Sequence, residues 1–207
     1  DEINRTPPKT QSALLESMQE YSVTIGGTKH KLDRPFFVLA TQNPIEQEGT
    51  YPLPEAQLDR FMLMIKLDYP DYQTEVEVIK NTTKDTYIAV KNVISKDEIL
   101  TFQNLVRSVP VVDNVYEYAV SLVHKTRPGR AGSSTLANDY LEWGAGPRAS
   151  QFLILGAKCH SLMTGKYAPD IEDVKAVAKS VLRHRIVRNF KAEAAGISET
   201  QIIQDLL

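Results

Sequence analysis

Four short segments of the sequence carry acidic, amide or arginine side chains that could take part in phosphate chemistry. They are Asp1-Glu2, Gln42-Asn43, Asp59-Arg60 and Pro147-Arg148. Carboxylates can hold a hydrated cation or polarise a water molecule, and an amide can orient that water. The flat guanidinium of arginine can bind phosphoryl oxygens through several hydrogen bonds at once. Each of these segments is common when taken alone, so their weight depends on the elements that carry them.

Each candidate also has a simpler structural interpretation. An acidic pair at a surface is usually just solvated, and Asn43, which precedes a proline, could cap a turn. Arg60 could pair with Glu55 or Glu46 on the surface. Arg148 falls in the first turn of an expected helix, where the helix dipole disfavours a cation. An anionic ligand would be one reason for that placement.

The first third of the chain has the pattern of an α/β domain. The spacing of apolar residues predicts a helix over 9–20, and a Gly-Gly pair between alternating residues predicts a β-hairpin over 21–32. The continuous apolar run 36–41 predicts a strand in the middle of a parallel sheet. A short helix is expected around 55–61, followed by a further strand over 62–67.

After Pro70 the pattern becomes helical, with a capping box at Ser95 and Glu98. The expected helices cover 71–82, one starting after 95, one starting at 113, 147–164, 170–183 and 198–207. Residues 127–140, rich in proline and glycine, are expected to form a loop. The chain therefore divides near residue 70 into an incomplete α/β part and an all-helical domain.

Taken in order, these segments resemble the motifs of MoxR-family AAA+ ATPases. Residues 1–16 are similar to the stretch at and after the family's Walker B strand, and 40–44 to the end of its sensor 1 strand. Residues 46–61 are similar to its arginine-finger segment and 144–150 to its sensor 2, with Gly146 where the family often has serine. The motifs follow the family order from residue 1 to about 190.

The resemblance implies a fold. Residues 1–70 would be the C-terminal part of an AAA+ P-loop NTPase core, a parallel sheet with helices, and would hold Walker B, sensor 1 and the arginine finger. Residues 71–207 would be a helical lid domain that carries sensor 2.

The resemblance also implies a role for each candidate, because ATP hydrolysis needs Mg²⁺ on the β- and γ-phosphates and an aligned attacking water. Asp1 would hold Mg²⁺ through water and so contribute to ATP binding, and Glu2 would orient and polarise the attacking water. Asn43 would hydrogen-bond that water or the γ-phosphate. Arg148 would contact the phosphates from the lid, and Arg60 would reach the nucleotide of the next subunit.

Other charged residues have open assignments. Arg5 is a second candidate for a contact between subunits, and Arg127 could face a nucleotide or a neighbour, or be a solvated loop residue. We expect the basic cluster 183–191 to be a solvated helix end or a subunit contact rather than a nucleic-acid patch, because it lacks interleaved aromatics. The four histidines lack metal-ligand spacing, and Cys159, in an apolar run, is expected to be a buried, inert thiol.

A glycine-rich phosphate loop ending in Gly-Lys-Ser/Thr does not occur in the sequence. We therefore expect the first strands and helices of the nucleotide-binding core to lie upstream. We also expect this chain alone to bind ATP weakly or not at all, to be inactive in hydrolysis, and to expose strand edges.

Composition limits the classes of partner. The net charge of -2 gives no support to a phosphate-driven nucleic-acid binder, and no apolar stretch is long enough for a membrane span. A single cysteine fits a reducing compartment, so a cytoplasmic location is expected.

The leading hypothesis is an ATP-driven remodeller of partner proteins that works as a ring. The resemblance implies a hexamer and chaperone-like work, often on proteins with von Willebrand A domains. A magnesium-chelatase-like or helicase-like motor stays open, because the expected hairpin carries Lys29, His30 and Lys31. A non-catalytic interaction module is the third alternative. A scaffold would not need all four of Glu2, Asn43, Arg60 and Arg148 together.

Overall fold

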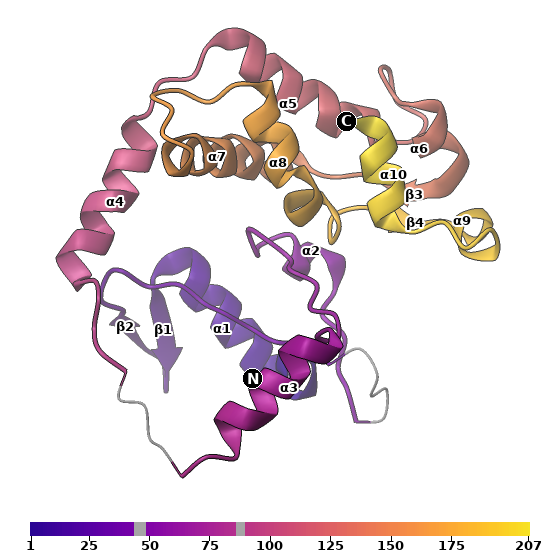
Figure 1. Ribbon diagram of the computed structural model, residues 1–207. Coiled ribbons are helices and arrows are strands. Elements are labelled where there is room, and N and C mark those ends of the chain that lie inside the picture. The colour runs from indigo at the N-terminus through magenta and orange to yellow at the C-terminus, as the bar shows by residue number, and fades with distance from the viewer. Residues whose placement is uncertain (44–48, 86–89) are drawn as a thin grey trace.

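The computed structural model describes residues 1–43, 49–85 and 90–207. Figure 1 shows two groups of elements. One holds the helices α5 (Asp113–Lys125), α7 (Pro147–Met163), α8 (Ile171–Leu182) and α10 (Glu199–Leu206), and the other holds α1 (Pro8–Glu20) with the hairpin of β1 (Ser22–Ile25) and β2 (Thr28–Lys31). The short helix α2 (Glu55–Leu58) lies between the two groups (Figure 1). No described helix is long and apolar enough to cross a membrane.

The N-terminal region consists of short elements with little burial. They are the 3-10 helix η1 (Ile3–Arg5), α1 (Pro8–Glu20), β1 (Ser22–Ile25), β2 (Thr28–Lys31), α2 (Glu55–Leu58) and α3 (Tyr72–Thr82). The expected hairpin forms as an antiparallel pair in which Ser22 lies opposite Lys31. Its turn uses Gly26 and Gly27 at φ 57° and 81°, a conformation that glycine adopts without strain.

The two strands expected at 36–41 and 62–67 are not formed, so this part of the prediction is wrong. Both segments are extended but pair with no strand among the described residues. Many of their apolar side chains are exposed, at 87% for Leu39 and 90% for Leu67, while others, such as Val38, are half-buried. A strand gains its hydrogen bonds and its burial from its neighbours, so an apolar run without neighbours stays an extended chain.

The C-terminal region contains a continuous core. Its elements are α5 (Asp113–Lys125), α6 (Thr135–Tyr140), β3 (Leu141–Trp143), α7 (Pro147–Met163), α8 (Ile171–Leu182), β4 (Val187–Arg188), α9 (Phe190–Ala194) and α10 (Glu199–Leu206). Buried side chains from α5, α7, α8 and α10 form one cluster, with Leu153 and Val174 fully buried at its centre. Gly156 lets α7 and α8 approach closely, because a Cβ there would lie 3.1 Å from Val177 Cγ2.

Some elements of this region were missed by the sequence analysis. Helix α6 occupies the end of the expected loop 127–140, where Ser134 caps it by accepting a hydrogen bond from the Ala137 N–H. The short antiparallel pair β3–β4 and helix α9 were also not expected. Cys159 is exposed on α7 rather than buried, because the core face of that helix is formed by other residues such as Leu153 and Ala157.

A buried carboxylate fixes the turn between α7 and α8. Asp173 is fully buried and accepts hydrogen bonds from His160 Nδ1 at 2.7 Å, from Lys166 Nζ and from the Asp170 N–H. Burial raises the pKa of Asp173, but these hydrogen bonds together outweigh burial and hold the pKa below its ordinary value. The ionised carboxylate is thus built into the start of α8.

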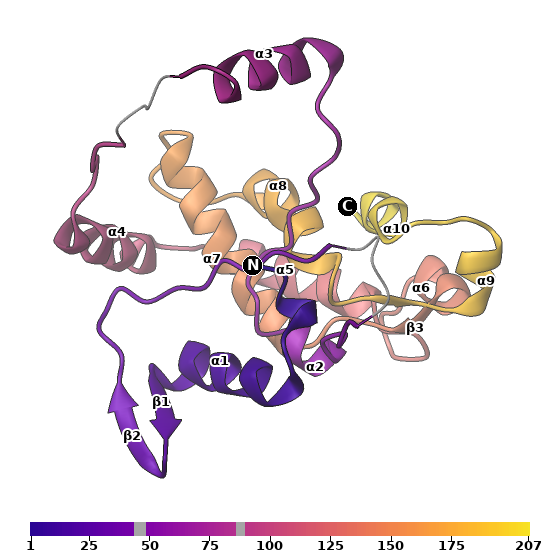
Figure 2. The same ribbon diagram turned by 90° about the horizontal axis from the view of Figure 1, so that it is seen from below.

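Two helices lie at the margin of the molecule. Helix α4 (Lys96–Ser108) packs on α7, and Lys158 Nζ donates to the Arg107 carbonyl at 3.0 Å. Helix α3 has no buried residue, and Figure 2 shows it far from α1 and the hairpin. Both begin as expected: Asp71 caps α3, and the Ser95–Glu98 capping box starts α4.

Candidate functional site

The acidic pair lies beside the end of the 36–41 segment. The Glu2 N–H donates to Thr41 Oγ1 at 2.8 Å, and the Ile3 N–H donates to the Thr41 carbonyl at 2.9 Å. The Thr41 hydroxyl in turn donates to the Asp1 carboxylate. These contacts bring the two N-terminal carboxylates next to the end of the segment that leads to Asn43.

Glu2 has an unusual backbone conformation for a residue with a side chain. Its φ and ψ are 48° and 60°, in the left-handed region, where a Cβ costs roughly 1–2 kcal/mol. Its carboxylate lies 3.0 Å from Arg5 Nε. Strained backbone gathers at functional sites more than elsewhere. Arg5, the second candidate for a contact between subunits, thus binds the Glu2 carboxylate of its own chain. Its role between subunits stays a prediction.

Asn43 is held close to the acidic pair through residue 4. The Asn4 Nδ2 amide donates to the Asn43 carbonyl at 3.4 Å, and Asn43 is half-buried. Three of the five predicted site residues, Asp1, Glu2 and Asn43, are thus brought to one place. The proline and the glutamate at 44 and 46, which the alternative interpretations of Asn43 and Arg60 involve, lie outside the described residues.

A buried glutamine that the sequence analysis missed supports this arrangement. Gln11 of α1 is 2% exposed, and its Nε2 donates to the Ile3 carbonyl at 3.1 Å and to the Tyr51 carbonyl at 2.9 Å. It therefore ties α1, η1 and the segment after residue 49 together. A polar residue on the apolar stripe of an expected helix was the available signal.

Arg148 lies in the first turn of α7, after Pro147, as expected. Its Nη1 binds Asp59 Oδ2 at 2.7 Å, and both side chains are partly buried, at 36% and 26% exposure. The carboxylate therefore supplies the anion that a cation at a helix N-terminus requires. Among the described residues Arg148 makes no contact with Asp1 or Glu2. Arg148 and Arg60, which follows Asp59 in the sequence, therefore belong to a second group around Asp59.

Arg60 is next to Asp59 and has no hydrogen bond or ion pair of its guanidinium within the described part of the chain. The proposed surface pair with Glu55 is therefore not formed. The side chain is half-buried. The Arg60 N–H donates to the Gln57 carbonyl at 3.1 Å, whereas the Arg60 guanidinium has no partner among the described residues.

Arg185 departs most from what the sequence predicts, because the basic cluster 183–191 was expected to be a solvated helix end or a subunit contact. Its side chain is 1% exposed, and its Nε lies 2.9 Å from Asp59 Oδ1. Its neighbour His184 is also buried, and Nε2 of that ring binds the Phe61 carbonyl at 3.0 Å. Burial, followed by the charge of Arg185, lowers the pKa of His184 to about 4, so the ring is neutral near pH 7.

The loop before Arg148 is fixed by a second loop. Arg127 Nε donates to the Ala145 carbonyl at 2.9 Å, and the Ala145 N–H donates to Thr126 Oγ1 at 3.0 Å. At Gly144 a Cβ would lie 2.2 Å from the Thr126 carbonyl oxygen, so no other residue fits without movement. Arg127 therefore positions the loop that leads to Arg148.

Gly146, where the resemblance expects serine, has no such constraint. It is the N-cap of α7 in an ordinary extended conformation, φ -81° and ψ 177°, with open space around its Cα.

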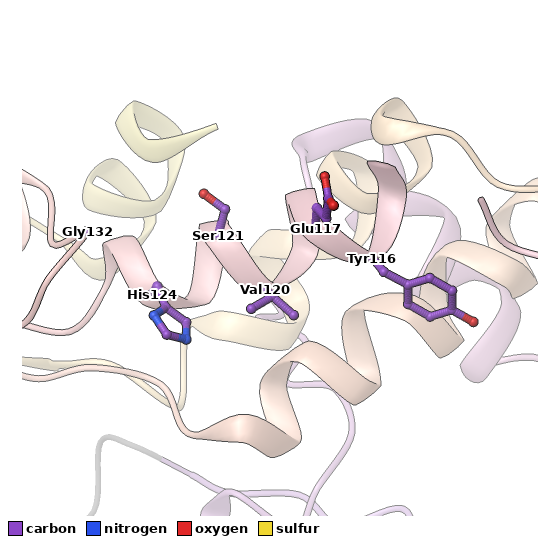
Figure 3. A pocket seen from close by; sticks show the side chains of 6 residues that line it. All are labelled: Tyr116, Glu117, Val120, Ser121, His124 and Gly132. Atoms are coloured by element: carbon purple, nitrogen blue, oxygen red, sulfur yellow. The ribbon is translucent and has the colours of Figure 1, made fainter. Parts of the chain in front are cut away.

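Two surface hollows lie away from the acidic pair Asp1-Glu2. A groove of about 500 Å³ runs along α5, and Figure 3 shows Tyr116, Val120 and His124 on one side of that helix, with Glu117 and Ser121 on the other. None of the predicted site residues lines it. A second hollow of about 350 Å³ lies between α2 and the end of α8 and includes His184 in its wall.

The described residues contain no group of three or more His, Cys, Asp or Glu side chains that could hold a metal by themselves. The exposed Asp1 carboxylate beside the Thr41 hydroxyl is a donor set that fits a hydrated Mg²⁺ carried in with phosphates, which supply further oxygens. The two residues thus fit one side of a Mg-nucleotide site.

Two family models match the chain. Residues 1–63 match the ATPase family associated with various cellular activities (AAA), and residues 133–206 match the AAA lid domain. The chain belongs to the AAA ATPase family. The α/β core part and the helical lid expected from the sequence are confirmed as AAA domain and AAA lid, while the boundary near residue 70 stays a prediction.

Relatives of this AAA chain include proteins of the MoxR type. Chaperone MoxR1 of Mycobacterium tuberculosis is 41% identical over 208 residues, which cover all of this chain and 55% of the relative. A Bacillus subtilis protein named YeaC is 39% identical over 208 residues and is covered to 62%. The predicted resemblance to MoxR-family ATPases is therefore confirmed, and the chain spans less than two thirds of the length of these relatives.

A solved structure supports the same fold. The crystal structure of a candidate ATPase from Cytophaga hutchinsonii superposes with a TM-score of 0.90 at 45% sequence identity. The match covers all of this chain and 63% of the other.

Proposed function

We propose that the chain is part of an ATP-hydrolysing, MoxR-type AAA+ remodeller of partner proteins. The placement of Asp1, Glu2 and Asn43 around the end of the 36–41 segment supports this proposal most directly. Phosphoryl transfer is catalysed mainly by positioning and by electrostatic stabilisation, and these three side chains are the types that it needs.

Each residue has a role in this proposal. Asp1 would hold Mg²⁺ through water, which neutralises charge on the β- and γ-phosphates when bound. Glu2 would polarise the attacking water, and Asn43 would hydrogen-bond that water or the γ-phosphate. Arg148 would exchange the Asp59 carboxylate for phosphate oxygens, because the guanidinium group can bind either anion through two N–H donors. Arg60 would act on the nucleotide of the next subunit.

Support for a ring and a client comes from family membership and from the Arg60 side chain. The Arg60 guanidinium has no partner among the described residues, which is consistent with a contact in trans, and one relative is named a chaperone. We therefore propose self-assembly into a ring, a hexamer, that acts on client proteins. Clients with von Willebrand A domains are part of the same proposal.

The test is Mg-ATP turnover by the full-length protein, measured per protomer as its concentration is raised. We expect a steep rise with concentration, because Arg60 would complete the site of a neighbour. The isolated 207-residue chain should bind Mg-ATP weakly or not at all, and submicromolar binding by it would contradict that expectation.

The matched variants are Glu2→Gln and Glu20→Gln. Loss of the water-polarising carboxylate should lower turnover by about 10²–10⁴-fold. The control removes a carboxylate that pairs with Lys29 on the surface, at 3.3 Å, and should leave turnover unchanged. No turnover by the wild type at any concentration would instead favour the non-catalytic interaction module.

A further inference from the structure

Arg185, at the end of α8, binds the backbone of the segment 59–62 with its whole guanidinium. Nε donates to Asp59 Oδ1 at 2.9 Å, and Nη2 donates to the Asp59 carbonyl at 2.8 Å and the Phe61 carbonyl at 2.5 Å. Nη1 donates to the Met62 carbonyl at 3.2 Å and to the Val181 carbonyl of α8, the helix that ends three residues before Arg185. Arginine has five N–H donors in a fixed plane, and each of them has an acceptor here.

The acceptors lie on both sides of Arg60 but do not include it. His184 adds a further hydrogen bond to the Phe61 carbonyl at 3.0 Å. The Arg185 guanidinium lies over the Phe152 ring, with Cζ 5.0 Å from the ring centroid. The backbone that carries Arg60 is therefore held from 59 to 62, while the Arg60 guanidinium stays unpaired among the described residues.

Such a buried charge has a large desolvation cost that its acceptors must offset. Arg185 is 1% exposed, and Asp59 is its only carboxylate partner in the part of the chain that the structure describes. The remaining acceptors are carbonyl oxygens, whose arrangement suits a planar fork and not the single point of an ammonium group. The site therefore requires the geometry of arginine as well as its charge.

We propose that Arg185 is a positioning residue for Arg60: the guanidinium at the end of α8 fixes the segment 59–62 so that Arg60 points at the nucleotide of the neighbouring subunit. The proposal rests on the function proposed above. Because Arg185 follows a helix of the lid, a movement of α8 would carry the segment with it. Lid position and hydrolysis at the neighbouring site would then be coupled through this contact.

The first arm of the test compares Arg185→Lys with Arg188→Lys in the full-length protein. Lysine keeps the charge but loses the fork, and a displacement of about 1 Å can cost about 10²-fold in rate. We expect kcat to fall by about 10–100-fold for Arg185→Lys while KM for ATP changes by less than about threefold. Arg188 pairs with Glu199 at 2.7 Å within the same segment of the lid, and its variant should keep kcat within about twofold.

The second arm tests action in trans. Subunits that carry Glu2→Gln cannot turn over ATP but still offer Arg60 to a neighbour. Mixed with wild type, subunits with Glu2→Gln and Arg185→Lys should depress turnover as strongly as those with Glu2→Gln and Arg60→Ala. Subunits with Glu2→Gln and Arg188→Lys should depress it no more than Glu2→Gln alone. Equal depression by the Arg185→Lys and Arg188→Lys mixtures would overturn the proposal.

The third arm uses hydrogen exchange and does not depend on activity. Arg185→Lys should speed amide exchange in residues 57–65 by at least about tenfold and leave the lid core at 149–157 unchanged. Equal acceleration in both would show a general structural role and would overturn the proposal. If the wild type has no turnover, the proposed function fails, and this arm alone decides whether Arg185 positions the segment.

Discussion

Apolar side chains are buried to very different extents in the two regions of the chain. In the lid, Leu122 and Leu153 are at most 1% exposed, whereas Leu39 and Leu67 in the N-terminal region are 87% and 90% exposed. The lid helices bury their apolar faces against one another, so each residue finds its partner within the chain. The extended segments of the N-terminal region need neighbouring strands for the same purpose. Burial is thus a property of complete layers and not of apolar runs.

The largest expected effect comes from a matched pair of leucines. In this chain, Leu153→Ala should lower the free energy of unfolding by about 2–5 kcal/mol, because it leaves a cavity in the core. Leu39→Ala should change it by less than about 0.5 kcal/mol, because that side chain is exposed. Urea unfolding followed by far-UV circular dichroism measures both.

The same pair sharpens the comparison in the full-length protein. There we expect Leu39→Ala to become destabilising, by more than about 1 kcal/mol, because the apolar segment would be covered by strands of the core. A loss that stays near zero would mean that the segment remains uncovered there too. Equal losses from the two variants in the present chain would remove the distinction between the regions.

The next effect concerns the contact that joins the two regions. His184 has a pKa of about 4 in the folded chain, below its ordinary 6.5, so the unfolded chain binds the proton more readily between these values. Stability is therefore full above pH 6.5 and falls as the pH drops toward 4, by up to about 3 kcal/mol. Unfolding measured from pH 7 to pH 4 tests the slope.

His184→Gln is the control for that slope. An amide can still donate to the Phe61 carbonyl but does not titrate in this range. The variant should therefore lose less stability between pH 7 and pH 4 than the wild type. A wild-type slope that is unchanged in the variant would assign the acid sensitivity to other groups, such as Asp173.

How much of the molecule the sequence predicts depends on the distance between partners. The capped helices were predicted well, since the capping box at Ser95 uses residues three apart. Arg185 was misjudged because Asp59, its partner, lies 126 residues away. The prediction of a strand at 36–41 was wrong for the same reason: the segment is apolar, but no strand that could pair with it lies among the described residues. Arg148 was placed correctly on its helix, while the anion that it binds was not foreseen.

The smallest expected effect compares the same motif in the two settings. Ser198 and Ser95 each form a capping box, before α10 and α4 respectively. Ser198→Ala should cost about 1 kcal/mol of the global free energy of unfolding, because α10 is part of the lid core. Ser95→Ala should change that global value little, because α4 has no buried residue and can open locally.

Hydrogen exchange separates these two outcomes. Amides of α4 should exchange faster in Ser95→Ala, while those of α7 and α8 keep their wild-type rates. If Ser95→Ala lowers the global free energy as much as Ser198→Ala does, α4 unfolds together with the lid and belongs to its cooperative unit.

The close approach at Gly144 limits how this lid can change over evolutionary time. Any mutation that adds a Cβ there would drive it into the Thr126 carbonyl and move the loop that leads into α7. Lineages can therefore vary the exposed positions around it, such as Trp143, but each replacement of Gly144 must be accompanied by a second change in the facing loop. Two simultaneous changes are rare, so descendants of this sequence should retain the glycine even where the exposed surface around it has diverged.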